Sequence, residues 1–271
     1  MIIQTAPTGK PHLVILQTDH ALMSGAFAAA FGNEEFAALN PVEPMIYVAG
    51  HHDEGWAPID ARVEQDHKTG LPYHLTGTPL PYLVQTSAGS PTFNEIHHPY
   101  SGIMSSMHTY GLFHGRYGLS DKVFIELIPD AHKTAVANML QAEIDRQTRL
   151  KTQMFANPTM APLATERVLF HNYKLLQFFD TLALYFHMVH EAARGNSYFE
   201  NVPRAVGDDV TINIRRVEQG IYTLTPYPFR ETGMSFGYIG HPLTPQPIGT
   251  NLQVLMAKTE PVAETIILLA G

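Results

Sequence analysis

The residues best suited to chemistry form a short block, "YVAGHHDEGW", at positions 47–56. Within it, His52 is followed directly by Asp53. An imidazole nitrogen and a carboxylate oxygen are ligands that iron, zinc and manganese all accept. The alternative interpretation is a histidine at a helix end beside a solvated aspartate, because such a dipeptide also occurs by chance. The pair therefore predicts half of a divalent transition-metal site, which other segments must complete.

Two polar residues in apolar helical sequence favour the metal interpretation. His20 lies early in "DHALMSGAFAAAF", where a histidine facing the core needs a partner. Asp180 lies in "KLLQFFDTLALYF", where a buried carboxylate is costly unless it is paired or bound to metal. The alternative for Asp180 is a buried pair with arginine. At helical spacing, Asp180 shares one face with Tyr173, Leu176, Leu184 and His187. We expect His20, His52, Asp53 and Asp180 to bind metal from three separate helices.

Several histidines between the His-Asp pair and Asp180 are candidates for further ligands. They are His74, His97, His98, His108, His114 and His132. We favour His108, together with one of His97, His98 or His132. One reason is that His97, Ser101, Met104 and His108 would share a helix face. Each of these histidines, taken alone, is more typical of a surface position or of one behind the ligands, so the choice among them stays open.

Three residues are candidates for catalysis rather than for metal binding. His51 is about 100° around a helix from His52, so both cannot easily face one ion, and we expect His51 to act beside the site as a base. Glu54 either orients a ligand histidine or is solvated. Arg116, in "HGRYG", is one of few cations available to an anionic substrate. Trp56, the only tryptophan, is expected at the pocket rim.

The H…HD…D arrangement resembles the HD-domain metalloenzyme superfamily, helical proteins in which a histidine, a His-Asp pair and a late aspartate bind metal. His52-Asp53-Glu54-Gly55 also matches the His-Asp-x-Gly that often continues the pair. More narrowly, residues 15–190 resemble a bacterial HD-like family with an HD(D/E)GW signature and no agreed activity. The matching elements are Asp19-His20-Ala21, His52 to Trp56, Thr69-Gly70-Leu71-Pro72, Ser106-Met107-His108 and Asp180-Thr181-Leu182-Ala183-Leu184.

The resemblance implies a metal-dependent enzyme, and three functions follow from it. The leading expectation is a non-heme oxygenase that uses one or two iron ions and dioxygen on a small organic substrate, as in relatives of myo-inositol oxygenase with extra histidines. The second is a phosphohydrolase of a nucleotide or phosphomonoester, in which manganese or zinc is also suitable. It would have few cations for phosphate, namely Arg62, Lys68, Arg116 and Lys174. The third is a metal-binding regulator without activity.

Composition excludes several other classes of protein. The 17 basic and 25 acidic residues give a net charge of −8, which argues against a nucleic-acid partner. The absence of cysteine excludes disulfides, thiolate metal sites and cysteine nucleophiles. No signal-peptide pattern and no run of roughly 18 apolar residues occurs, so we expect a cytoplasmic protein without a membrane partner. The oligomeric state is left open.

The elements that must position these residues are mainly helical. We expect strands at 1–5 and 12–18, helices at 18–31, 41–56, 97–118, 121–155 and 162–194, and a long irregular connection at 57–95. Strands are expected again after residue 206. The predicted fold class is mainly α: an HD-domain-like helical core with a small β-sheet from the N-terminal hairpin and the C-terminal strands. We expect one domain over 1–271, with the helical core at about 18–195 and the β-rich part at about 206–271.

Overall fold

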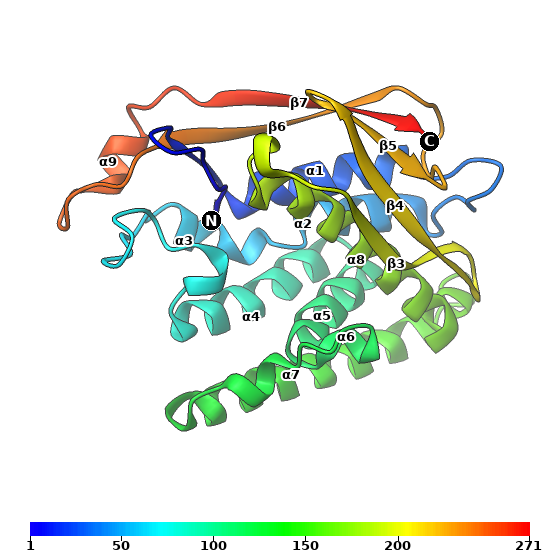
Figure 1. Ribbon diagram of the computed structural model, residues 1–271. Coiled ribbons are helices and arrows are strands. Elements are labelled where there is room, and N and C mark those ends of the chain that lie inside the picture. The colour runs from blue at the N-terminus through cyan, green and yellow to red at the C-terminus, as the bar shows by residue number, and fades with distance from the viewer.

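The computed structural model describes residues 1–271 and places a twisted sheet over a layer of helices (Figure 1). The helices are α1 (Gln17–Ala30), α2 (Val42–His51), α3 (Ala57–Asp60), α4 (Leu80–His97), α5 (Pro99–Phe113), α6 (Gly115–Gly118), α7 (Asp130–Phe155), α8 (Glu166–Met188) and α9 (Leu252–Met256). Short 3-10 helices occur at Glu54–Trp56, Leu75–Gly77, Phe124–Leu127, Ala161–Ala164 and Glu191–Ala193. Helix α1 lies beneath the sheet, and α7 lies furthest from it.

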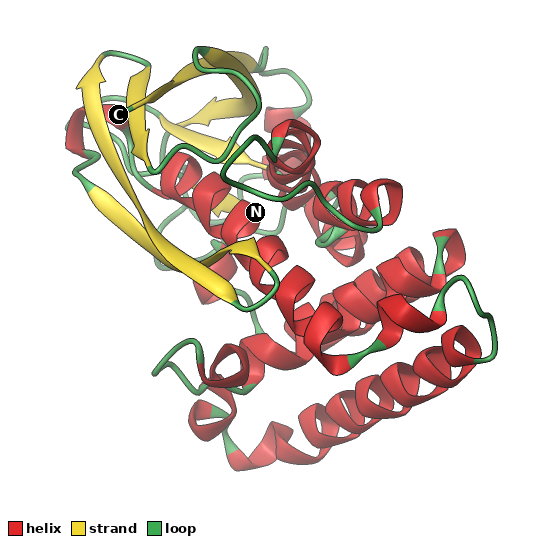
Figure 2. Cartoon of the chain, turned by 90° about the vertical axis from the view of Figure 1, so that its right-hand side faces the viewer, coloured by secondary structure: helices red, strands yellow, loops and turns green.

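The sheet contains seven strands, so the predicted mainly α, HD-like core with a small sheet is wrong. The strands are β1 (Ile2–Ile3), β2 (His12–Ile15), β3 (Ser197–Ala205), β4 (Asp208–Glu218), β5 (Ile221–Thr225), β6 (Met234–Leu243) and β7 (Val262–Ala270). They form a mixed sheet in the order β1-β2-β6-β7-β5-β4-β3, in which only β5 and β7 run parallel. Helices account for 50% of the chain and strands for 20%. Figure 2 shows the strands gathered on one side and most helices on the other.

The N-terminal strands do pair with the C-terminal ones, as predicted. Strand β2 is antiparallel to β6, with His12 opposite Leu243. The sheet nevertheless exceeded expectation because β3, β4 and β5 continue it beyond β7. Strands β3, β4 and β5 follow one another as antiparallel neighbours, and the parallel pairing of β5 with β7, which are distant in sequence, joins them to the rest of the sheet.

The segment at 57–95 is not the irregular connection that its Pro, Gly and Thr content predicts, because α4 occupies its second half. Pro91 lies inside this helix, and Gly89 lies against Gly55. The buried face of α4 consists of Thr86, Ser90, Pro91 and Asn94 rather than large apolar residues. Packing of these small side chains against neighbouring elements therefore outweighs a weak helical pattern.

Helix α8 runs through the centre of the molecule and joins the helical layer to the sheet. Its apolar side chains belong to one core cluster with residues of α1, α2, α5 and the strands. Aromatic rings connect the two layers directly; for example, the ring centroids of Phe27 and Phe236 are 4.7 Å apart. None of the helices combines the length and the apolar character needed to cross a bilayer. The central position of α8 explains how a polar residue on it can meet ligands from several helices.

Candidate metal centre

Five of the predicted ligands meet in one pocket of about 180 Å³. His20 comes from α1, His108 from α5 and Asp180 from α8. His52 and Asp53 follow the last residue of α2 directly. Asp53 is partly exposed, and the other four side chains are almost completely buried. The structure thus brings together the H, HD and D residues and adds His108 to them.

Glycines allow α1 and α2 to approach closely enough for His20 and His52 to meet. The helices cross at Gly25 and Gly50, and a Cβ atom on Gly25 would lie 2.7 Å from the Gly50 Cα atom. The ring centroids of His20 and His52 are 5.4 Å apart. Only a residue without a side chain fits at Gly25 with this helix spacing.

Helix α4 fixes the chain on both sides of the His-Asp pair. The Asn94 side-chain amide donates to the His51 carbonyl oxygen at 2.8 Å. The Gly55 backbone N–H donates to the Ser90 hydroxyl at 2.9 Å. A Cβ atom on Gly55 would lie 2.2 Å from the Thr86 carbonyl oxygen, so this glycine is required by the close approach of α4. The segment predicted as a loop therefore holds the candidate ligands in place.

The distances between ligand atoms suit a single ion. His20 Nε2 lies 3.1 Å from Asp180 Oδ1, and His52 Nε2 lies 3.8 Å from the same oxygen. His52 Nε2 is also 3.6 Å from Asp53 Oδ2. Metal–ligand bonds of about 2.0–2.2 Å separate neighbouring ligands by roughly 3–3.6 Å, so these atoms lie close to the arrangement around one ion.

The surroundings of His52 fit a metal ligand. Its Nδ1–H donates to the Ala49 carbonyl oxygen at 2.9 Å, which directs the Nε2 lone pair toward Asp53 and Asp180. Nε2 is fully buried and has no hydrogen-bond partner. A buried polar atom without a partner is costly, and a bound cation would satisfy it.

His108 is held by a residue that the sequence did not single out, Gln177 of α8. The Gln177 side-chain amide lies 2.7 Å from His108 Nδ1, and its Oε1 has no partner. Oxygen and nitrogen of such an amide are assigned from their contacts, and with the amide turned over Oε1 would accept from His108 Nδ1–H. Nε2 of His108 would then carry its lone pair toward the pocket. Burial, with the nearby His52, lowers the pKa of His108 to about 3, so this ring is neutral at physiological pH.

His20 has a partner behind it, His187 of α8. The two Nδ1 atoms are 3.0 Å apart, so one of them must donate and the other accept. When His20 donates, its Nε2 is left free for a metal. Burial keeps the pKa of His187 well below its usual value, so His187 is neutral and its Nδ1 can accept this hydrogen bond. The His187 ring lies 4.5 Å from that of Tyr238. The sequence placed His187 on the Asp180 face of the helix but gave it no role.

The charges of the centre favour an ion between the two carboxylates. Burial would raise the pKa of Asp180, but the hydrogen bond with His20 and the nearby His52 hold it well below its usual value. Burial would likewise lower the pKa of His52, but Asp53 and Asp180 raise it to about 9. Without metal, a protonated His52 therefore supplies the positive charge that a metal ion would replace.

The other candidate histidines lie outside the centre and have different partners. His74 accepts a hydrogen bond from the Ile3 N–H, and His97 contacts Glu43 and stacks on Tyr47. His98 caps the N-terminus of α5, and His114 contacts the Tyr110 carbonyl oxygen. His132 lies in the first turn of α7. Of the predicted mid-chain histidines only His108 reaches the pocket. A separate ligand set for a second ion does not assemble from these side chains.

The three catalytic candidates divide into two groups. His51 and Glu54 contact each other at 3.1 Å and do not line the pocket. The His51 ring lies 4.4 Å from Tyr47, on the outer side of α2. Arg116 does line the pocket, as does Trp56, which is buried at its wall. Only Arg116 therefore lies where a substrate beside the ion would reach it.

The fold and the site together define a mixed α/β protein with a buried centre of three histidines and two aspartates. The protein family described as "Protein of unknown function (DUF3891)" matches residues 1–243. Because this match covers most of the 271 residues, the chain belongs to that family. No curated protein and no solved structure matches the chain.

Proposed function

We propose that this chain is a metal-dependent enzyme that binds one divalent transition-metal ion, preferably iron. We propose that it oxidises a small organic substrate with dioxygen. The observation that carries the proposal is the buried, unpartnered Nε2 of His52, which faces two carboxylates and lies between two other histidines. Most buried polar atoms have a hydrogen-bond partner, and a bound cation between the two carboxylates would satisfy this nitrogen. Because a chain without cysteine needs no oxidising compartment for disulfides, we also propose that the enzyme acts in the cytoplasm.

The ligands support one ion rather than two. Two groups of three residues are close enough to share an ion: His20, His52 and Asp53, and also His52, His108 and Asp180. Both groups contain His52, whose Nδ1 is already bonded to Ala49. His52 therefore has one nitrogen to offer, and the two groups describe overlapping parts of a single coordination sphere.

The donor set favours iron and oxygen chemistry. The combined set of three histidines and two aspartates contains the two histidines and one carboxylate that are typical of non-heme iron oxygenases. Iron held in this way supplies activation of dioxygen beside a bound substrate. The protein's own contribution is to orient the ligand rings through Ala49, Gln177 and His187 and to enclose the ion. Manganese or zinc would fit the same donors.

Arg116 supports a second candidate function, the hydrolysis of a phosphomonoester. It lines the metal pocket and forms no ion pair with an acidic side chain. A free guanidinium beside a metal ion suits a phosphoryl group. One arginine neutralises only part of the charge of a phosphate dianion, so the oxygenase remains the leading proposal.

Two measurements on the iron-loaded protein separate these functions. Nitric oxide, a stable substitute for dioxygen, should give the electron paramagnetic resonance signal of a ferrous nitrosyl complex, because an oxygenase keeps a coordination position open. Oxygen consumption with a panel of small organic substrates should then exceed that of the zinc-loaded protein. Phosphate release from phosphomonoesters, without nitric oxide binding or oxygen uptake, would contradict the oxygenase and support the hydrolase.

A further inference from the structure

A larger cavity continues from the metal pocket. It has a volume of about 490 Å³ and lies between the 3-10 helix Leu75–Gly77, α4, the end of α5 and the turn that follows α5. The two cavities share the lining residues Leu75, Leu83, Ser87, Leu112 and Arg116. A molecule bound in the larger cavity would therefore reach the candidate metal centre past Arg116.

The lining of this cavity combines apolar surface with positive charge. Leu75, Leu83, Leu112, Phe113 and Phe124 supply the apolar part. Arg116 and the exposed Lys122 are its charged residues, and no acidic side chain lines it. The cavity therefore suits a molecule with an apolar body and a negative charge.

The backbone at Arg116 is in a conformation that L-residues rarely adopt. Arg116 and Tyr117 have φ angles of 52° and 56°, and the φ angles of the flanking Gly115 and Gly118 are also positive. Four consecutive residues thus form a left-handed turn, which is unfavourable for the two that carry side chains. Unfavourable backbone conformations persist where the surrounding structure requires them, often at ligand sites. Here the turn directs Arg116 to the junction of the cavities.

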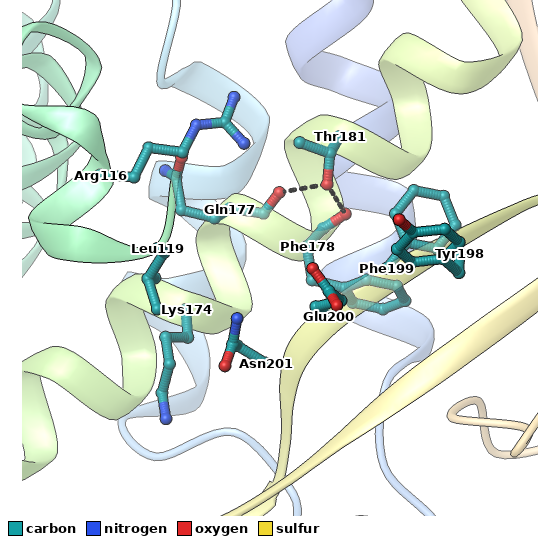
Figure 3. A pocket seen from close by; sticks show the side chains of 10 residues that line it. All are labelled: Arg116, Leu119, Lys174, Gln177, Phe178, Thr181, Tyr198, Phe199, Glu200 and Asn201. Atoms are coloured by element: carbon teal, nitrogen blue, oxygen red, sulfur yellow. Dashed lines mark hydrogen bonds between the residues drawn. The ribbon is translucent and has the colours of Figure 1, made fainter. Parts of the chain in front are cut away.

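Arg116 has no competing anionic partner within the protein. It forms no ion pair, whereas nearby Lys174 is paired with Asp209. Figure 3 shows a neighbouring pocket of about 250 Å³, in which the Arg116 guanidinium and the Lys174 ammonium lie at opposite ends. Arg116 and His108 line the same pocket, so the guanidinium lies beside the candidate metal centre.

We propose that the ligand of this double cavity is a small organic monoanion, a carboxylic acid with an apolar body, whose carboxylate is held by Arg116. A planar guanidinium donates two parallel hydrogen bonds to a carboxylate and is well suited to this role. The apolar body lies against Leu83, Leu112 and their neighbours. This inference rests on the proposed function in taking the acid to be the substrate, and it names the substrate class of the same site.

Calorimetric titration of the metal-free protein, kept in a chelator, tests the anion site by itself. The probes are 4-phenylbutanoate and its uncharged amide, 4-phenylbutanamide, which share shape but differ in charge. The unaltered protein should bind the acid at least tenfold more tightly than the amide. Equal binding of acid and amide, or no binding of either, would overturn the proposal, and this comparison needs no variant.

Two variants assign the preference to Arg116. Arg116→Gln should remove the preference for the acid while leaving amide binding unchanged. Arg215→Gln is the matched control, because Arg215 is exposed on β4 and lies outside these cavities. An acid preference that survives in Arg116→Gln would contradict the assignment.

Metal analysis of the same preparations distinguishes this proposal from the proposed function. Acid binding by a chain that cannot bind metal would support the anion site and contradict the metal-dependent enzyme. Metal binding without any acid preference would contradict the anion site alone.

Discussion

At the scale of single residues, the proposed metal ion would compete with a proton for Nε2 of His52. The carboxylates of Asp53 and Asp180 raise the pKa of this side chain to about 9, above its ordinary value of about 6.5. In the metal-free protein the protonated form contributes stability in full below pH 6.5, and this contribution is lost as the pH rises through 9. Metal binding must release this proton.

Metal affinity should therefore rise with pH. Between pH 6.5 and 8.5 we expect an increase of up to about tenfold per pH unit, because one proton leaves His52 for each ion bound. Competition with a chelator of known affinity, at several pH values, measures this dependence. An affinity that stays constant over this range would mean that His52 is already neutral or does not bind the ion.

Gln177 is expected to position His108 rather than to touch the metal. Gln177→Met keeps the length of the side chain but removes its hydrogen bond, and we expect metal affinity to fall by about 10–100-fold. Gln141→Met is the control, since Gln141 contacts only Asp145 on the exposed face of α7. The same affinity in both variants would show that Gln177 does not orient His108.

Four of the five candidate ligands could be singled out from sequence because each carries a local signal, whereas His108 was one of several open choices. His52 and Asp53 are adjacent, and His20 and Asp180 are polar residues in apolar helices. Gln177 and His187 were not predicted as partners of the ligand histidines. Gln177 lies three residues before Asp180 and His187 seven residues after it, so both share its helix face. Glutamine is common in helices, and only the three-dimensional position of His108 makes this one distinctive.

At the scale of elements, the meeting of α1 and α2 depends on two glycines that are not equivalent. A Cβ atom on Gly25 would lie 2.7 Å from the Gly50 Cα atom, whereas one on Gly50 would lie 3.7 Å from the Gly25 Cα atom. The first distance requires the helices to move apart, and the second is an ordinary contact. The two positions therefore provide a matched pair of substitutions.

Gly25→Ala should reduce the free energy of unfolding by about 1–3 kcal/mol and weaken metal binding, because it separates His20 from His52. Gly50→Ala should be neutral or stabilise by up to about 1 kcal/mol, since alanine favours the helix. Denaturant unfolding and metal titration of both variants test the difference. Equal effects of the two substitutions would contradict the account of this crossing.

Helix α4 shows why the elements were harder to predict than the ligands. Its buried face carries small and polar residues, and Pro91 interrupts the sequence signal of a helix. The helix forms because that face fits against Gly55 and α5, which is a tertiary effect. The long helices α7 and α8 have stronger apolar periodicity and were predicted, although α7 begins at Asp130 rather than at 121 and α8 spans Glu166–Met188 within the predicted 162–194.

At the scale of the whole molecule, the candidate metal centre joins segments that are far apart in the chain. Its ligands come from α1, the end of α2, α5 and α8, and α8 connects them to the sheet. The size of the sheet was underestimated because β3 begins before the expected β-rich part, and because the parallel pairing of β5 with β7 is not encoded in the pattern of either strand.

The measurement that tests the central claim most directly is the metal content of the purified protein and of three variants. The unaltered chain should bind one equivalent of a divalent transition metal and should melt at a higher temperature with it, because the ion binds only the folded state. His52→Ala and Asp180→Ala should lose the ion, whereas His97→Ala, a histidine outside the centre, should retain it. An unaltered protein that binds no transition metal, or variants of His52 and Asp180 that keep the full equivalent, would contradict the account.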